Sequence, residues 1–218
     1  MSIPGYETKC LLTDNFDTDL ENWVFRGDGS ALFTGTGRLN LTGNSKKNGV
    51  VLWLKEKIHH DFLLEYEINV NDSSGLCAVI LCAQSPDNTD ILNSSPPPSG
   101  NLMSYTKNTN SYLVDFHNMS RSTGIHGASK VRKNPGYMLL SSVDRDPCSE
   151  SRPYYIDIAK IGNRIQLYVD GVRIHDIRDK GGFGPAYLNG YIGFWVHGKT
   201  NQYNAEIDNV RLFRLIPE

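Results

Sequence analysis

A cationic span at residues 91–143 holds most of the side chains that could do chemistry, in a chain whose formal net charge is −2. Asp115 is the only acid in this span. Its cations and histidines are Lys107, Arg121, Lys130, Arg132, Lys133, His117 and His126. Guanidinium groups bind carboxylates through two parallel hydrogen bonds, and a lysine adds a point charge. We therefore predict that Arg121, Arg132 and Lys133 bind the carboxylates of an acidic sugar, the alternative being an ordinary charged surface loop.

The run SYLVDFH at residues 111–117 is typical of a strand, and it sorts its side chains onto two faces. Asp115 and His117 share one face, opposite an apolar set. The run GYIGFWVHG places Trp195 and His197 on one face in the same way. Aromatic rings beside hydrogen-bonding groups suit a sugar site, because the C–H face of a pyranose packs on a ring. The predicted sugar face comprises Asp115, His117, Tyr191, Trp195, His197, Trp53 and Gln84; each alone is more typical of an ordinary half-buried residue, and the prediction depends on the set.

Elimination at a uronic acid needs a base, an acid for the leaving oxygen and cations that neutralise the carboxylate. The candidate proton carriers are His117, His197, Asp115, Tyr105 and Tyr112, of which Tyr112 is the least suited because the alternation places it in the core. The residues of the cationic span therefore match the needs of elimination better than those of hydrolysis by a pair of carboxylates. Ser/His/Asp catalysis has no nucleophile elbow of the form G-x-S-x-G to support it.

Hydrolysis of a glycosidic bond needs two carboxyl groups, and Glu65 and Glu67 alternate on one face of the run LLEYEINV. The neighbouring positions on that face, Leu63 and Asn69, are not acidic. Because these flanking positions carry no acid, the pattern favours a solvated outer face over a glycosidase pair.

Metal-ligand patterns in the sequence are weak. The pairs His59-His60 and His175-Asp176 lack the spacing of a transition-metal site. A calcium ion bridging the two ends of the chain through Asp17 and Asp208 would need only oxygen ligands. Plain hydrogen bonding is the alternative for these aspartates. We expect no other cofactor.

Positioning these residues requires strands, and apolar residues recur with period two along the chain. Three apolar sets are predicted to lie between two sheets: Leu64/Tyr66/Ile68, Ile165/Leu167/Val169 and Ile192/Phe194/Val196. Asp170-Gly171 is a type I′ hairpin signal. Two loops, residues 84–110 and 118–136, are predicted on either side of the strand at 111–117. We expect an all-β jelly-roll sandwich of two antiparallel sheets, one domain spanning residues 1–218 with a core from about 13 to 215.

Composition narrows the class of protein. A chain of 218 residues with pI near 6.3 is not attracted as a whole to nucleic acid or to a membrane surface. The start, MSIPGYETKCLL, has no basic-then-apolar pattern of a signal peptide, and no apolar run approaches a membrane span. The four cysteines, at positions 10, 77, 82 and 148, have no metal-ligand spacing. We predict that all four are free and that the protein is cytoplasmic.

The closing runs resemble concanavalin A-like, galectin-like jelly rolls: YYIDIAKIGNRIQLYVDGVRIHD, GYIGFWVHG and AEIDNVRLFRL. The middle runs are similar to the YesU-type family of uncharacterised bacterial proteins: FDTDLENWVF, GVVLWLKEKIHHDFLLEYEI, GLCAVILCAQ and VRKNPGYMLL. The match extends from about Thr13 to Leu215. This resemblance implies a two-sheet sandwich with a concave sugar-holding face, and an association with bacterial breakdown of pectin, rhamnogalacturonan in particular. It implies no established reaction.

The leading hypothesis is therefore a carbohydrate-active enzyme, hydrolase or lyase, that acts on acidic oligosaccharides of pectin. A non-catalytic sugar-binding protein would need the aromatic face but no proton carriers. A docking protein would use the cations to bind an acidic surface. We expect an oligosaccharide ligand and no nucleic-acid or membrane partner, and we predict no particular oligomeric state.

Overall fold

The computed structural model describes residues 1–44, 49–70, 75–87, 90–93, 100–101, 106–120, 125–198 and 203–218. Regular structure in these residues is β-strand apart from a helical turn at 106–108. No helix in these ranges is long and apolar enough to cross a bilayer. The expectation of an all-β protein is confirmed.

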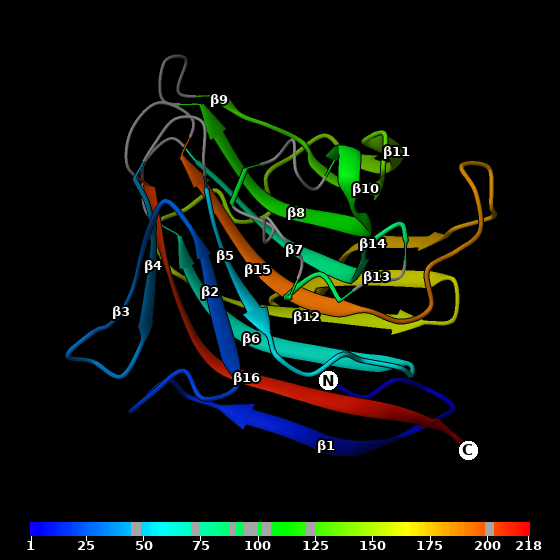
Figure 1. Cartoon of the computed structure of the whole chain (residues 1–218), viewed down its shortest axis with the longest axis horizontal. Coiled ribbons are helices and arrows are strands. Elements are labelled where there is room, and N and C mark those ends of the chain that lie inside the picture. The colour runs from blue at the N-terminus through cyan, green and yellow to red at the C-terminus, as the bar shows by residue number, and fades with distance from the viewer. Residues whose placement is uncertain are drawn as a thin grey trace.

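The strands form two antiparallel sheets that pack face to face (Figure 1). Sheet A contains β1 (Tyr6–Asp14), β3 (Gly29–Phe33), β4 (Leu39–Gly43), β6 (Phe62–Val70), β12 (Pro153–Ile161), β13 (Arg164–Val169), β14 (Val172–Arg178) and β16 (Tyr203–Pro217). Its order is β14-β13-β12-β6-β16-β4-β3, and β1 also pairs with β16. The first and last strands thus lie side by side, as Figure 1 shows.

Sheet B contains β2 (Trp23–Gly27), β5 (Val50–Leu54), β7 (Gly75–Gln84), β8 (Asn110–Ser120), β9 (Ile125–His126), β10 (Ser129–Asn134), β11 (Met138–Val143) and β15 (Tyr191–Gly198). Its order is β11-β10-β8-β7-β15-β5-β2, and β9 pairs with the end of β8. We call the face of sheet B that points away from sheet A its outer face.

The main hydrophobic core lies between the sheets. All three predicted apolar sets belong to it, and each of their side chains is at most 4% exposed. The alternation along β6 and β15 accounts for this placement, because every second side chain must face the opposite sheet. The predicted hairpin is also confirmed: Asp170 and Gly171 join β13 to β14 with φ angles of 49° and 73°, as a type I′ turn requires.

The predicted loop at residues 118–136 is partly wrong. Residues 129–134, SKVRKN, form β10 and pair with both β8 and β11. Val131 completes the core between the sheets, while Arg132 faces outward. The cations had suggested a solvated loop, but two neighbouring strands supply a full ladder of backbone hydrogen bonds to this segment.

Candidate functional site

The outer face of sheet B carries most of the predicted sugar-site residues. Register places Trp53 beside Gly193, and Trp195 beside Ala78. Ala78 in turn lies opposite Asp115, whose neighbour on β10 is Lys130. The predicted residues that share this face are Trp53, Asp115, Arg132, Tyr191, Trp195 and His197.

A β-bulge in β8 turns His117 to the opposite side of the sheet. Ala78 pairs with Asp115 but the preceding Cys77 pairs with His117, so Phe116 is an extra residue. An extra residue reverses the alternation that follows it. His117 consequently stacks on Tyr203 of the core, with ring centroids 5.9 Å apart. The prediction that His117 shares a face with Asp115 is wrong, because the two-residue period ends at the bulge.

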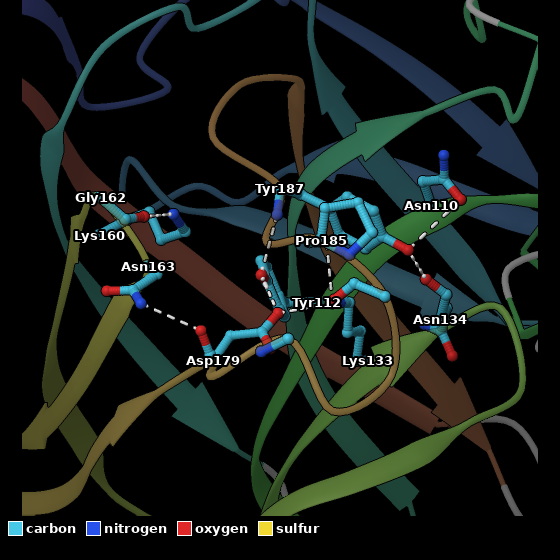
Figure 2. Close-up of polar contacts among 12 residues, drawn as sticks. Asn110, Tyr112, Lys133, Asn134, Lys160, Gly162, Asn163, Asp179, Pro185 and Tyr187 are labelled. Atoms are coloured by element: carbon cyan, nitrogen blue, oxygen red, sulfur yellow. Dashed lines mark hydrogen bonds and ion pairs between the residues drawn. The ribbon is translucent and has the colours of Figure 1, made fainter.

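Lys133 also points inward and is 1% exposed. Its ammonium group donates to Asp179 Oδ2 at 2.7 Å and to the carbonyl oxygens of Gly184 and Pro185 at 2.7 and 2.9 Å. Tyr112 donates to the same Asp179 oxygen at 2.6 Å. Figure 2 shows these contacts joining β8 and β10 to the connection between β14 and β15. Lys133 is therefore not an exposed cation, contrary to the sequence prediction.

The aromatic part of the outer face is covered. Trp53 and Trp195 are 0% and 1% exposed, and they cluster with Ile91 and Leu92 of the connection that follows β7. The indole of Trp195 donates to the carbonyl of Gly100 at 3.0 Å. The rings of Trp53 and Trp195 are therefore not open to a sugar in this structure, because the connection that follows β7 packs on them; this agrees with the alternative that each is a buried residue.

Asp115 and Arg132 form what we call the polar end of the outer face, together with Tyr137. Asp115 is 2% exposed, and its carboxylate accepts a hydrogen bond from the Lys130 backbone at 2.8 Å. Burial raises the pKa of Asp115 to about 7, against the lowering effect of that hydrogen bond and of Lys130 and Arg132. A carboxyl group whose pKa lies near neutrality suits proton transfer.

Arg132 is held in place beside Asp115. Its guanidinium lies over the Tyr137 ring at 4.0 Å, and Nη1 donates to the Tyr137 carbonyl at 2.9 Å. Within the described residues, the buried Nε of Arg132 has no hydrogen-bond partner and the side chain forms no ion pair. Its charge is therefore available to an anionic group.

The remaining predicted residues are Gln84, Tyr105, Arg121 and His197. Gln84, at the end of β7, donates to the side chain of Asn189 at 2.9 Å. Tyr105 and Arg121 lie outside the described residues. His197 stacks on Trp195, with ring centroids 5.3 Å apart.

Sheet A has a polar cavity of about 330 Å³ on its outer side, which the sequence analysis did not anticipate. Glu65 is only 5% exposed, and Arg211 pairs with it at 2.9 Å; the amino group of Met1 also contacts it. Burial, and repulsion by Glu65, raise the pKa of Asp157 on the neighbouring strand. Tyr155 is 62% exposed at the same cavity. The expectation that Glu65 lies on a solvated face is wrong, because cross-strand neighbours enclose it.

Asp17 and Asp208 lie close enough to interact, since repulsion by Asp17 adds to burial in raising the pKa of Asp208. Asp17 accepts a hydrogen bond from Asn15 at 2.6 Å, and Asp208 accepts one from the Asn209 backbone at 2.7 Å. These contacts are the hydrogen bonding expected as the alternative to calcium. Calcium binding here stays a prediction.

Comparison with models of protein families shows the family to which the chain belongs. The model of a domain of unknown function, DUF1961, matches residues 9–206. The chain belongs to the DUF1961 family. No curated protein matches the sequence.

Solved structures similar to this DUF1961 member share its fold. A Bacillus subtilis protein of unknown function with a galectin-like fold superposes with a TM-score of 0.85 at 18% identity, covering 98% of this chain and 100% of the other. The endo-β-1,3-glucanase of Pyrococcus furiosus gives 0.65 at 14% identity, with 100% and 98% covered. The carbohydrate-binding module CBM66 of Bacillus subtilis gives 0.55 at 17%, with 87% and 93% covered. The galectin-like jelly roll expected from the sequence is confirmed.

Proposed function

We propose that this protein is a carbohydrate-active enzyme that cleaves acidic oligosaccharides of the pectin type at the polar end of the outer face of sheet B. The observation that carries the proposal is the buried Asp115 carboxyl, whose pKa of about 7 is unusual for an aspartate and which is influenced by the charge of Arg132, a side chain with no ion pair among the described residues. Strongly shifted carboxyl groups next to a specific charge are typical of catalytic sites. Similar folds serve a glucanase and a carbohydrate-binding module, which supports a sugar ligand.

The two residues supply the parts that elimination at a uronic acid requires. Arg132 neutralises the sugar carboxylate, and Asp115 in its ionised form removes the proton beside that carboxylate. The carbon–oxygen bond to the leaving sugar breaks as the carbon–carbon double bond forms. The leaving oxygen then takes a proton, for which His197 on the same face is our candidate. Hydrolysis would instead use Asp115 in its protonated form as the general acid.

Incubation with pectic oligosaccharides tests this proposal, with new ultraviolet absorbance and new reducing ends recorded together. Absorbance from an unsaturated product indicates elimination, and reducing ends alone indicate hydrolysis. We expect Asp115→Asn to lower turnover about a hundredfold or more, the range of general acid–base catalysis. Lys9→Ala, an exposed cation on β1 of the other sheet, is the matched control and should leave turnover unchanged.

Arg132→Ala should weaken acidic oligosaccharides about tenfold to a hundredfold, because a charge-assisted hydrogen bond contributes about 1.5–3 kcal/mol. Neutral oligosaccharides should be unaffected, and rising salt should weaken the acidic ligands. Equal affinity for acidic and neutral sugars, without salt dependence, would contradict the role given to Arg132. Absence of any cleavage would contradict the enzymatic proposal.

A non-catalytic carbohydrate-binding function is the second candidate, and the sheet A cavity favours it. An exposed aromatic ring, Tyr155, stands there beside acidic, amide and guanidinium groups. In that case Tyr155→Ala should abolish sugar binding while Asp115→Asn and Arg132→Ala leave it intact, as measured by calorimetry. The proposal also includes a cytoplasmic setting, which the four free cysteines support.

A further inference from the structure

His117, which the bulge turns away from the polar end, belongs to a second cluster. It lies on β8, His126 lies on β9, and Asp146 lies in the connection between β11 and β12. Pairing of Met119 with His126 brings β9 back beside β8. The ring centroids of His117 and His126 are consequently 6.2 Å apart. Sequence separations of nine and twenty residues concealed this grouping.

The ligand atoms of the cluster converge. Nδ1 of His126 and Nδ1 of His117 lie 2.9 and 3.1 Å from the same oxygen, Oδ2 of Asp146. One ligand atom from each of the three residues lies within 4.8 Å of the other two. Ligand atoms around a tetrahedral zinc ion stand about 3.3 Å apart, given metal–ligand bonds of about 2.0–2.1 Å. Side-chain rotations that bring the ligand atoms to this spacing would place one ion at bonding distance from all three.

The carboxylate is already oriented. The Asp146 side chain is 0% exposed; Oδ1 accepts the backbone N–H of Cys148 at 2.9 Å and Oδ2 accepts that of Asn118 at 3.0 Å. Both oxygens of this buried carboxylate therefore already face backbone hydrogen-bond donors. Asp146 is thus an anion fixed beneath two imidazole rings, which favours a cation at this position.

His117 lies almost wholly buried at this cluster, and its Nδ1 faces the carboxylate. The residue is 2% exposed, and its Nε2 is buried with no hydrogen-bond partner among the described residues. Its Nδ1 is shared between Asp146 and the Cys148 carbonyl, which lies 2.8 Å away. The His126 side chain is 30% exposed and offers a path from solvent.

We propose that His117, His126 and Asp146 bind a divalent transition-metal ion of the zinc class. Two imidazoles and one carboxylate are a donor set that such ions prefer, and three protein ligands leave a fourth position for water. The bound ion would replace the hydrogen bonds that the histidines now make and would join β8, β9 and the connection after β11. This site is separate from Asp115 and Arg132, so it stands or falls independently of the proposed enzymatic function.

Calorimetric titration with Zn²⁺ tests the site, using tag-free protein treated with chelator and carrying Cys10→Ser. That substitution removes the exposed thiol, which would itself bind zinc. We expect one ion per chain. His126→Ala should weaken binding by at least about tenfold, since even loss of an outer contact to a ligand costs about 10–100-fold. His59→Ala removes an exposed histidine elsewhere and should leave the affinity unchanged.

Titration with Co²⁺ gives a second readout, because direct coordination produces visible absorption bands that depend on the ligands. Asp146→Asn keeps the shape of the side chain and should diminish these bands, as His126→Ala should. Saturable binding that is equal in the wild type and in both variants would overturn the assignment. So would the absence of zinc and cobalt binding by folded wild-type protein, and His117, His126 and Asp146 would then be a hydrogen-bonded cluster only.

Discussion

Three buried aspartates show how the immediate partners set the charge of a carboxyl group. Burial raises the pKa of each one, yet only Asp115 ends well above the usual value. Asp146 has two histidines, and Asp179 has Lys133 and Tyr112, so in both the pKa is lowered. Asp115 has one backbone hydrogen bond and more distant cations, which do not compensate for lost hydration.

Replacing Asp115 by Asn should change how stability depends on pH. The carboxyl group has a pKa of about 7 in the folded state and about 4 when unfolded. Between these values the folded chain holds the additional proton, so the contribution of Asp115 to stability falls as pH rises from 4 to 7 and is constant above that range. Relative to the wild type, Asp115→Asn should gain up to about 4 kcal/mol across this window.

Urea denaturation at intervals of pH measures this difference. The variant must be compared with the wild type at each pH, because burial lowers the pKa of His175 to about 4. The contribution of His175 to stability therefore rises with pH, opposite to that of Asp115. Asp144→Asn, at an exposed carboxylate, should follow the wild-type curve at every pH. A difference between Asp115→Asn and the wild type that does not vary with pH would contradict the raised pKa.

At the scale of elements, the connection between β14 and β15 is held to sheet B by buried polar contacts. Lys133 binds Asp179 and two carbonyls of this connection, while the Tyr187 backbone donates to the Tyr112 hydroxyl at 3.0 Å. Tyr187 also donates to the Asn134 carbonyl at 2.8 Å, as Figure 2 shows. A segment without regular strands is thus positioned by residues of β8 and β10.

Lys133→Ala should lower the free energy of unfolding by about 3–5 kcal/mol, because it leaves the Asp179 carboxylate buried without its cation. Lys180→Ala, at an exposed position of the same connection, should change stability by less than about 0.5 kcal/mol. Chemical denaturation measures both, and amide exchange should show faster exchange at Tyr187 only in Lys133→Ala. If Lys133→Ala left stability unchanged and weakened the binding of acidic sugars, Lys133 would instead bind the sugar carboxylate, as the sequence predicted.

At the scale of the whole molecule, apolar layers lie on both sides of sheet B. One is the core between the sheets, and the other is the cluster over Trp53 and Trp195 on the outer face. The strands β7 and β15 are buried along almost their whole length as a result. Cys77, Cys82 and Cys148 all lie in the core between the sheets, and Cys10 alone is exposed.

Thiol titration should therefore distinguish the exposed Cys10 from the three buried cysteines. Burial raises the pKa of Cys77 to about 12 and that of Cys82 to about 11, and it also raises the pKa of Cys148 well above its usual value, so little thiolate is present at neutral pH. Ellman's reagent should react rapidly with one thiol in the native protein and with all four in denaturant. Cys10→Ser should abolish the native reaction. More than one rapidly reacting thiol would contradict the buried placement of the other cysteines.

The sequence by itself determined most of the strands, the two-sheet sandwich, the type I′ turn and part of the outer face of sheet B, namely Asp115, Trp195 and His197, because period-two alternation and turn chemistry act over a few residues. Tertiary structure decided what those residues do. The bulge at Phe116 reversed His117, pairing on both sides made a strand of residues 129–134, and Asp179 drew Lys133 inward. The raised pKa of Asp115, the burial of Trp195 and the meeting of His117, His126 and Asp146 likewise depend on segments distant in the chain. Burial and ion pairing are properties of what surrounds a side chain, and no local pattern contains them.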